Sequence, residues 1–122
     1  MAEWPVGRRG LAILLWATDP KDPERCVTPF FHAAAAAAME VEVEVFFAAR
    51  SVHLLTPEGA NRATADAMRE AVRHGVRFYA CSQALQAQGI DRSRVLSEVA
   101  GIAGAAAFVA RVLDPNWSSL TF

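Results

Sequence analysis

Two cysteines are the residues of this sequence best suited to covalent chemistry. Cys81 directly follows an apolar run, residues 76–80, and directly precedes residues 82–88, which are typical of a short helix. A thiol at such a corner lies beside the free N–H groups and the positive end of the helix, which favour the thiolate. The thiolate is the reactive form for sulfur transfer, disulfide exchange or acyl attack. The alternative is that Cys81 only fills space, because free cysteine is among the most buried residue types.

Cys26 is the second thiol, and it lies in the segment that follows the first predicted strand. Ligands of parallel α/β proteins bind where the chain leaves the carboxyl ends of the strands, so Thr18, Asp19 and Cys26 are candidate binding residues. Ser82 and Gln83 join them, because their main-chain amides follow the strand-ending cysteine. Cys26 can resolve an oxidised partner thiol or pass sulfur on, although packing at a helix start is the preferred interpretation. No Cys-x-x-Cys motif supports a thioredoxin-type dithiol.

The remaining polar residues do not form a motif for metal or nucleotide binding. His32, His53 and His74 have no nucleophile partner that is visible in the sequence. No Cys/His cluster has zinc spacing, and neither a Gly-x-Gly-x-x-Gly motif nor a P-loop follows the first strand. The sequence therefore predicts neither a metal site nor a cofactor.

Length and composition favour a small globular domain. The chain has 122 residues, which is enough for one domain with a real core and too few for two. Its 53% hydrophobic and 20% charged residues exclude a disordered chain, and a net charge of −1 argues against nucleic-acid or membrane partners. The apolar run 11–17 is at the short limit for a signal peptide and lacks a cleavage site, and no segment is long enough to span a bilayer. A cytoplasmic protein is therefore expected.

The elements that must position Cys81 begin with two strands. After a loose lead-in over residues 1–9, residues 11–16 form a continuous apolar run, typical of a strand covered on both faces. Residues 41–47 alternate strictly, so that three glutamates share one face, which we interpret as solvated. That pattern predicts a strand near a sheet edge or beside an opening. The three glutamates are Glu40, Glu42 and Glu44.

Helical patterns alternate with the strands. Asp22-Pro23 and Thr28-Pro29 offer competing helix starts before an alanine-rich helix, and residues 60–74 form an amphipathic helix stopped by Gly75. Residues 52–55 are a short apolar extension, and further strands are predicted over 76–80, 95–99 and 117–122, with a helix over 101–113. This order predicts a single-domain, three-layer α/β/α sandwich over residues 10–122, with a mainly parallel sheet of about five strands. The thin, alanine-lined helices also favour self-association.

Several of these segments together resemble the DsrE/DsrF-like family. The resemblance runs from about Gly10 to Phe122, and its most specific part is the strand-ending cysteine followed by a small-residue helix. The segments that carry it are Ala-Thr-Asp at 17–19, Asp-Pro-Glu-Arg at 22–25, Glu-Val-Glu-Val-Phe at 42–46, Gly-Val-Arg-Phe-Tyr-Ala-Cys-Ser-Gln-Ala-Leu at 75–85 and Gly-Ala-Ala-Ala-Phe-Val at 104–109.

The resemblance implies a sulfurtransferase-like persulfide carrier. In sulfur-relay members of the family, the cysteine at the position of Cys81 accepts sulfane sulfur as a persulfide and passes it to small carriers such as TusA-like proteins. It also implies assembly as a homo-oligomer, as a trimer or hexamer, or with related DsrE/F-type subunits. Two alternatives stay open: a non-catalytic oligomeric module that binds a small ligand or a partner, and a redox protein that uses Cys26 together with Cys81.

Overall fold

The computed structural model describes residues 9–122, so the predicted lead-in over residues 1–9 lies outside the described residues, except for Arg9. Five parallel strands form one sheet in the order β4-β3-β2-β1-β5. The chain therefore runs outward from β1 to β4 and then crosses back to place β5 on the other side of β1. The strands are β1 Gly10–Leu15, β2 Glu42–Phe47, β3 Arg77–Ala80, β4 Gly101–Ile102 and β5 Trp117–Thr121.

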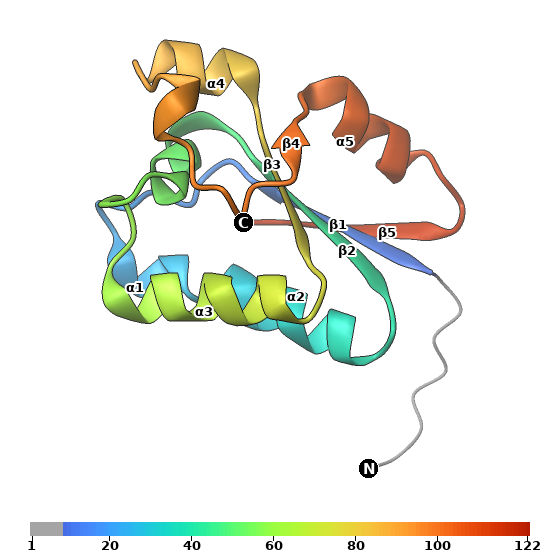
Figure 1. Cartoon of the computed structure of the whole chain (residues 1–122). Coiled ribbons are helices and arrows are strands. Elements are labelled where there is room, and N and C mark those ends of the chain that lie inside the picture. Colours follow the sequence, from blue (N-terminus) through green and yellow to red (C-terminus); the bar gives the residue numbers. More distant parts are fainter. Residues whose placement is uncertain (1–8) are drawn as a thin grey trace.

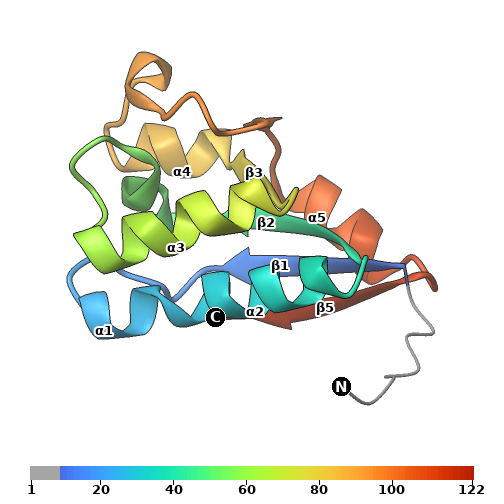
Figure 2. The ribbon, with the colours of Figure 1, turned by 60° about the horizontal axis from the view of Figure 1, so that its bottom comes forward.

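Helices cover both faces of the sheet, as the sandwich prediction requires. α2 and α3 lie against one face and α5 against the other, while α4 stands beyond the ends of the strands (Figure 1; Figure 2). The prediction of a three-layer α/β fold is confirmed. Among residues 9–122, no helix is long and apolar enough to cross a bilayer. The helices are α1 Pro23–Cys26, α2 Thr28–Ala38, α3 Arg62–Arg73, α4 Ser82–Ala87 and α5 Ala105–Val112, with 3-10 helices η1 Ala49–Leu55 and η2 Arg92–Arg94.

Local sequence explains most helix ends. The two competing starts near residues 22 and 28 are both used, because α1 and α2 meet at Val27 and each has a proline in its first turn. α3 begins after Asn61, whose side chain accepts a hydrogen bond from the Thr64 amide. It ends before Gly75, whose φ of +92° is a conformation that favours glycine.

The main core lies between the sheet and the α2–α3 layer. Three buried rings form its centre, with centroids 5.9 Å apart for Phe30 and Phe47, 5.6 Å for Phe30 and Phe78, and 5.2 Å for Phe47 and Phe78. Leu85 of α4 is only 2% exposed and belongs to the same core. The apolar burial that fixes α2 thus also fixes the helix that follows Cys81.

The prediction for the second strand is wrong in two respects. β2 lies inside the sheet between β1 and β3, not at an edge. Glu44 is not solvated: it is 5% exposed, and its carboxylate accepts hydrogen bonds from Arg111 Nε at 2.7 Å and from an Arg77 terminal nitrogen at 3.0 Å. Arg111 also stacks on Trp117, with its guanidinium carbon 4.0 Å from the ring centroid. The alternating pattern could not indicate the burial of Glu44, because its partner Arg111 belongs to α5 and lies 67 residues later in the sequence.

Two shorter segments also differ from expectation. Residues 95–99 were predicted as the fourth strand, but they form a loop in which the Leu96 amide donates to the Leu55 carbonyl at 2.8 Å. The fourth strand is β4, whose two residues pair with Tyr79 and Ala80. The apolar extension at residues 52–55 belongs to the 3-10 helix η1, which turns its apolar residues into the core instead of lengthening β2.

The buried carboxylate of Glu44 gives a stability prediction. Glu44→Ala should lower the free energy of unfolding by about 2 kcal/mol, because it removes the anion shared by Arg77 and Arg111, two arginines that stay partly exposed and can rehydrate. Glu42→Ala, on the same strand and face but exposed, should change it by less than about 0.5 kcal/mol. Urea unfolding measures both values, and equal effects of the two substitutions would contradict the assignment.

Candidate functional site at the Cys81 corner

The main chain of Cys81 belongs to both the sheet and a helix. Its amide donates to the Phe47 carbonyl of β2 at 3.0 Å, which extends the parallel ladder one residue beyond β3. Its carbonyl accepts from the Leu85 amide at 3.0 Å, which starts α4. With φ −74° and ψ 122°, Cys81 is the extended residue that precedes the first turn of α4. The predicted corner is therefore present, and it holds Cys81 without backbone strain.

Cys81 is only partly buried, unlike the residues that flank it in the core. Cys81 is a half-buried free cysteine, whereas Ala80 is 0% and Leu85 2% exposed. The chain that leaves β3 enters α4 on the α2–α3 side, while the chain that leaves β4 turns through Ala103 toward α5 on the other side. Cys81 consequently lies where two neighbouring connections diverge, a position at which parallel sheets leave room for ligands.

Ser82 and Gln83 follow Cys81 in the first turn of α4. Ser82 is half-buried and Gln83 is exposed, so both are reachable from solvent. The first turn of a helix leaves its amides without intrahelical acceptors, and these N–H groups point toward the preceding residue. An anionic sulfur at position 81 would therefore have main-chain donors beside it, although a helix of six residues supplies only a short dipole.

Cys26 occupies a different environment. It is 1% exposed, and its Sγ donates to the Asp19 carbonyl at 3.3 Å and to the Asp22 carbonyl at 3.4 Å. Burial raises the pKa of the Cys26 thiol, and the nearby charges of Asp22 and Asp19 raise it further. These contacts close the loop between β1 and α2, and they describe a thiol that packs, as the preferred interpretation of Cys26 expected.

Thr18 and Asp19 lie at the same end of the sheet, but the contacts of the Asp19 side chain are within the loop after β1 and with the turn after β2. Thr18 is 4% exposed. Asp19 accepts from the Lys21 amide at 3.0 Å and from Arg50 Nε at 3.0 Å. The Lys21 amide is the main cause that lowers the pKa of the Asp19 carboxyl, and Arg50 adds to it. Within residues 9–122, no hydrogen bond joins this pair to Cys81, so Thr18 and Asp19 share an end of the sheet with the cysteine without contacting it through a hydrogen bond.

A polar network that the sequence did not indicate holds α4 in place. Gln88 Oε1, just after α4, accepts from an Arg50 terminal nitrogen at 3.2 Å and lies 3.0 Å from His53 Nε2. Arg50 also binds Asp19 and thereby links the loops after β1 and β2 to α4. No local pattern reveals these partners, because Arg50 and Gln88 are 38 residues apart.

The site thus combines one partly exposed cysteine, a main chain hydrogen-bonded on both sides and the first-turn amides of α4. Among the described residues, no group of three His, Cys, Asp or Glu side chains could hold a metal ion. The chemistry available at the corner is that of a single thiol.

Alkylation distinguishes the two thiols. In the folded protein, iodoacetamide should modify Cys81 at least about tenfold faster than Cys26, because buried cysteines of raised pKa react slowly. In urea the two rates should become similar, because unfolding removes the burial. Peptide mass spectrometry after timed quenching measures both rates. A folded protein that labels Cys26 as fast as Cys81 would refute the contrast.

Comparison with solved structures shows the same fold in proteins of low sequence identity. MTH1491 from Methanobacterium thermoautotrophicum, described as of unknown function, superimposes with a TM-score of 0.73 at 21% identity, covering 94% of this chain and 99% of that one. The ychN protein from E. coli gives 0.77 at 16% identity over 93% and 99% of the two chains. BT1422 from Bacteroides thetaiotaomicron, also of unknown function, gives 0.63 at 15% identity over 92% and 94%.

The sequence comparison is more specific. No curated protein matches the chain. The DsrE/DsrF-like family, however, matches residues 12–122. This range includes the whole Cys81 corner and all five strands, apart from the first two residues of β1. The resemblance found in the sequence is thereby confirmed at the level of the family. The chain belongs to the DsrE/DsrF-like family.

Proposed function

We propose that this protein carries sulfane sulfur as a persulfide on Cys81. The observation that carries the proposal is the partly exposed cysteine at the β3–α4 corner, set against a second cysteine that is buried and hydrogen-bonded. Family membership supports it, because the strand-ending cysteine is the feature through which the sequence resembles sulfur-relay proteins. The protein would act as a sulfurtransferase-like carrier without a cofactor.

The transfer needs only thiols and a donor persulfide. The Cys81 thiolate attacks the terminal sulfur of R–S–SH, the donor S–S bond breaks, and RS⁻ leaves and takes up a proton. Cys81–S–SH then gives its terminal sulfur to an acceptor thiolate, such as that of a TusA-like carrier, and Cys81 returns as the thiolate. No net oxidation occurs in either step. The first-turn amides of α4, including those of Ser82 and Gln83, are placed to donate to the terminal sulfur.

The structural features weigh differently on the two alternatives. A redox role that pairs Cys26 with Cys81 would require Cys26 to be attacked or to attack, and its burial and raised pKa oppose both. A non-catalytic binding module would not need a partly exposed cysteine at position 81. Its ligand would nevertheless bind at the same end of the sheet as in the carrier proposal. Persulfide loading separates the two, because a binding module gains no covalent sulfur.

Mass spectrometry tests the carrier proposal directly. After incubation with a sulfane-sulfur donor and removal of excess reagent, the wild-type protein and Cys26→Ala should each gain the mass of a sulfur atom at Cys81. Cys81→Ser should gain none, because its hydroxyl cannot form a persulfide. Circular dichroism before and after loading verifies that every variant stays folded. A folded wild-type protein that gains no sulfur at Cys81 would refute the proposal.

We propose also that the carrier works as a homo-oligomer, assembled through α5. That helix has no buried residue, although six of its eight residues are alanine or valine and it adds Phe108. Val109, Val112 and the following Leu113 are 48%, 45% and 77% exposed. A helix that is apolar all round is normally covered. Its one cation, Arg111, is bound to Glu44, so this face can meet a second copy of itself without opposing like charges.

The oligomer proposal predicts a mass change for α5 variants. Leu113→Glu should shift the protein from its oligomer toward the monomer, because it places a carboxylate within the paired apolar face. Met39→Glu, an equally polar change at a 42% exposed residue after α2, should leave the mass unchanged. Size-exclusion chromatography with light scattering measures both. A monomeric wild type, or an unchanged oligomer in Leu113→Glu, would contradict the assignment.

A further inference from the structure

A hollow lies at the same end of the sheet as Cys81, but away from it. It has a volume of about 340 Å³ and lies between the ends of β1 and β5 and the start of the α1–α2 segment. Its volume is within the range of small-molecule sites, roughly 300–1,000 Å³. The residues that line it are Ala17, Thr18, Glu24, Arg25, Thr28 and Phe122.

The topology of the sheet explains why a hollow forms there. Strands β2, β3 and β4 extend from β1 in one direction, and β5 alone lies on its other side. The strand order therefore reverses between β1 and β5, and parallel α/β proteins bind ligands in the crevice outside the strand ends at such a reversal. Cys81 follows β3, which is separated from β1 by β2, so the thiol belongs to a different part of the edge.

Aromatic rings flank the hollow. The amides of Trp16 and Ala17 both donate to the Phe122 carbonyl, at 2.9 and 3.0 Å, which ties the ends of β1 and β5 together. The Phe122 ring lies 5.5 Å from the His32 ring, and His32 Nδ1 lies 2.9 Å from the Thr28 carbonyl, which holds the imidazole in place. Trp16, directly after β1, is 60% exposed. Phe122 is the aromatic residue of the lining itself, and its ring favours a ligand with an apolar part.

The charged lining limits the ligand further. Glu24 and Arg25 are exposed neighbours of opposite sign on α1, and both belong to the lining of the hollow. A pure anion would meet the Glu24 carboxylate, and a pure cation would meet the Arg25 guanidinium, so each would leave one like charge opposed. Arg25 uses its Nε for Asp22 at 3.1 Å, which leaves its terminal nitrogens to donate to a carboxylate. The Thr18 and Thr28 side chains add hydroxyls that can donate or accept.

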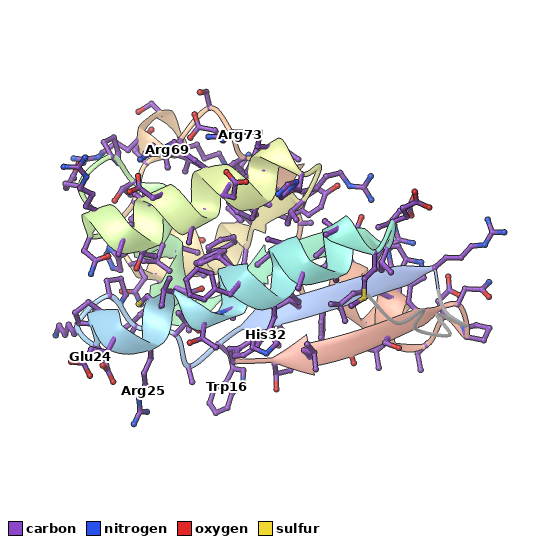
Figure 3. All side chains as sticks on the ribbon, turned by 90° about the horizontal axis from the view of Figure 1, so that it is seen from below. Trp16, Glu24, Arg25, His32, Arg69 and Arg73 are labelled. Atoms are coloured by element: carbon purple, nitrogen blue, oxygen red, sulfur yellow. The ribbon has the colours of Figure 1, made fainter. Side chains whose placement is uncertain are left out.

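We propose that this hollow binds a free amino acid with an apolar side chain. Arg25 takes the carboxylate, Glu24 takes the ammonium group, and Phe122 packs against the side chain. The site is independent of sulfur transfer, because it requires neither Cys81 nor α4. Figure 3 shows Glu24, Arg25, Trp16 and His32 along one border of the molecule, whereas Arg69 and Arg73 lie along the opposite border.

The test uses L-leucine as the probe and the folded full-length chain. Titration at millimolar concentrations, followed by ¹H–¹⁵N NMR, should move the amide signals of Ala17, Thr18 and Thr28 along saturable curves. N-acetyl-L-leucine lacks the ammonium group and L-leucine methyl ester lacks the carboxylate. Each should bind about fivefold to tenfold more weakly, which corresponds to roughly 1 kcal/mol for one charged hydrogen bond.

Matched arginine variants complete the test. Arg25→Gln should weaken leucine binding by about fivefold or more and should no longer distinguish leucine from its methyl ester. Arg73→Gln is the control, because Arg73 forms the same kind of exposed ion pair, three residues after Glu70, on the far side of the molecule. The proposal is overturned if leucine causes no saturable shift at these amides, if both derivatives bind as tightly as leucine, or if the two variants behave alike.

Discussion

The structure depends on the two main-chain hydrogen bonds of Cys81. Its amide ends the ladder between β2 and β3, and its carbonyl begins the hydrogen bonding of α4. A residue bound on both sides cannot turn its peptide planes, so the direction of its side chain follows from the sheet. The thiol is therefore carried by a residue whose main chain is bound on both sides, although it lies at a corner where a strand gives way to a connection.

The apolar core supports that corner from one side only. Phe47 and Phe78 lie in the strands that flank the corner, and Leu85 anchors α4 in the same core. On the other face, the small cluster around Phe46 and Trp117 is covered by one helix of eight residues. Glu44 can be buried on this face because its carboxylate pairs with two arginines, so burial does not leave its charge unpaired. Because no second layer covers α5 within the described residues, its apolar residues Val109 and Val112 are exposed.

The local parts of this arrangement could be predicted from sequence, and the long-range parts could not. The corner at Cys81 follows from an apolar run, a short helical segment and glycine, which are all encoded within a few residues. The burial of Glu44 and the Arg50–Gln88 contact depend on which elements the sheet order brings together. That order is not visible in the periodicity, because alternation reports the two faces of a strand and not what covers them. The prediction of a strand over residues 95–99 was wrong for a related reason, because an apolar pattern is typical of both strands and packed loops.

The strand order also separates the two kinds of chemistry at one edge of the sheet. All five strands are parallel, so every connection that follows a strand starts from the same end. The thiol follows β3 on one side of β2, and the charged, aromatic hollow follows β1 and β5 on the other. Between them lies the turn after β2, where Ala49 adopts a φ of +51° and Arg50 reaches both Asp19 and Gln88. A non-glycine residue at positive φ persists only where its surroundings hold it, and here the Arg50 contacts tie that turn to the loop after β1 and to α4. The turn therefore separates the two sites, which share an edge without sharing residues.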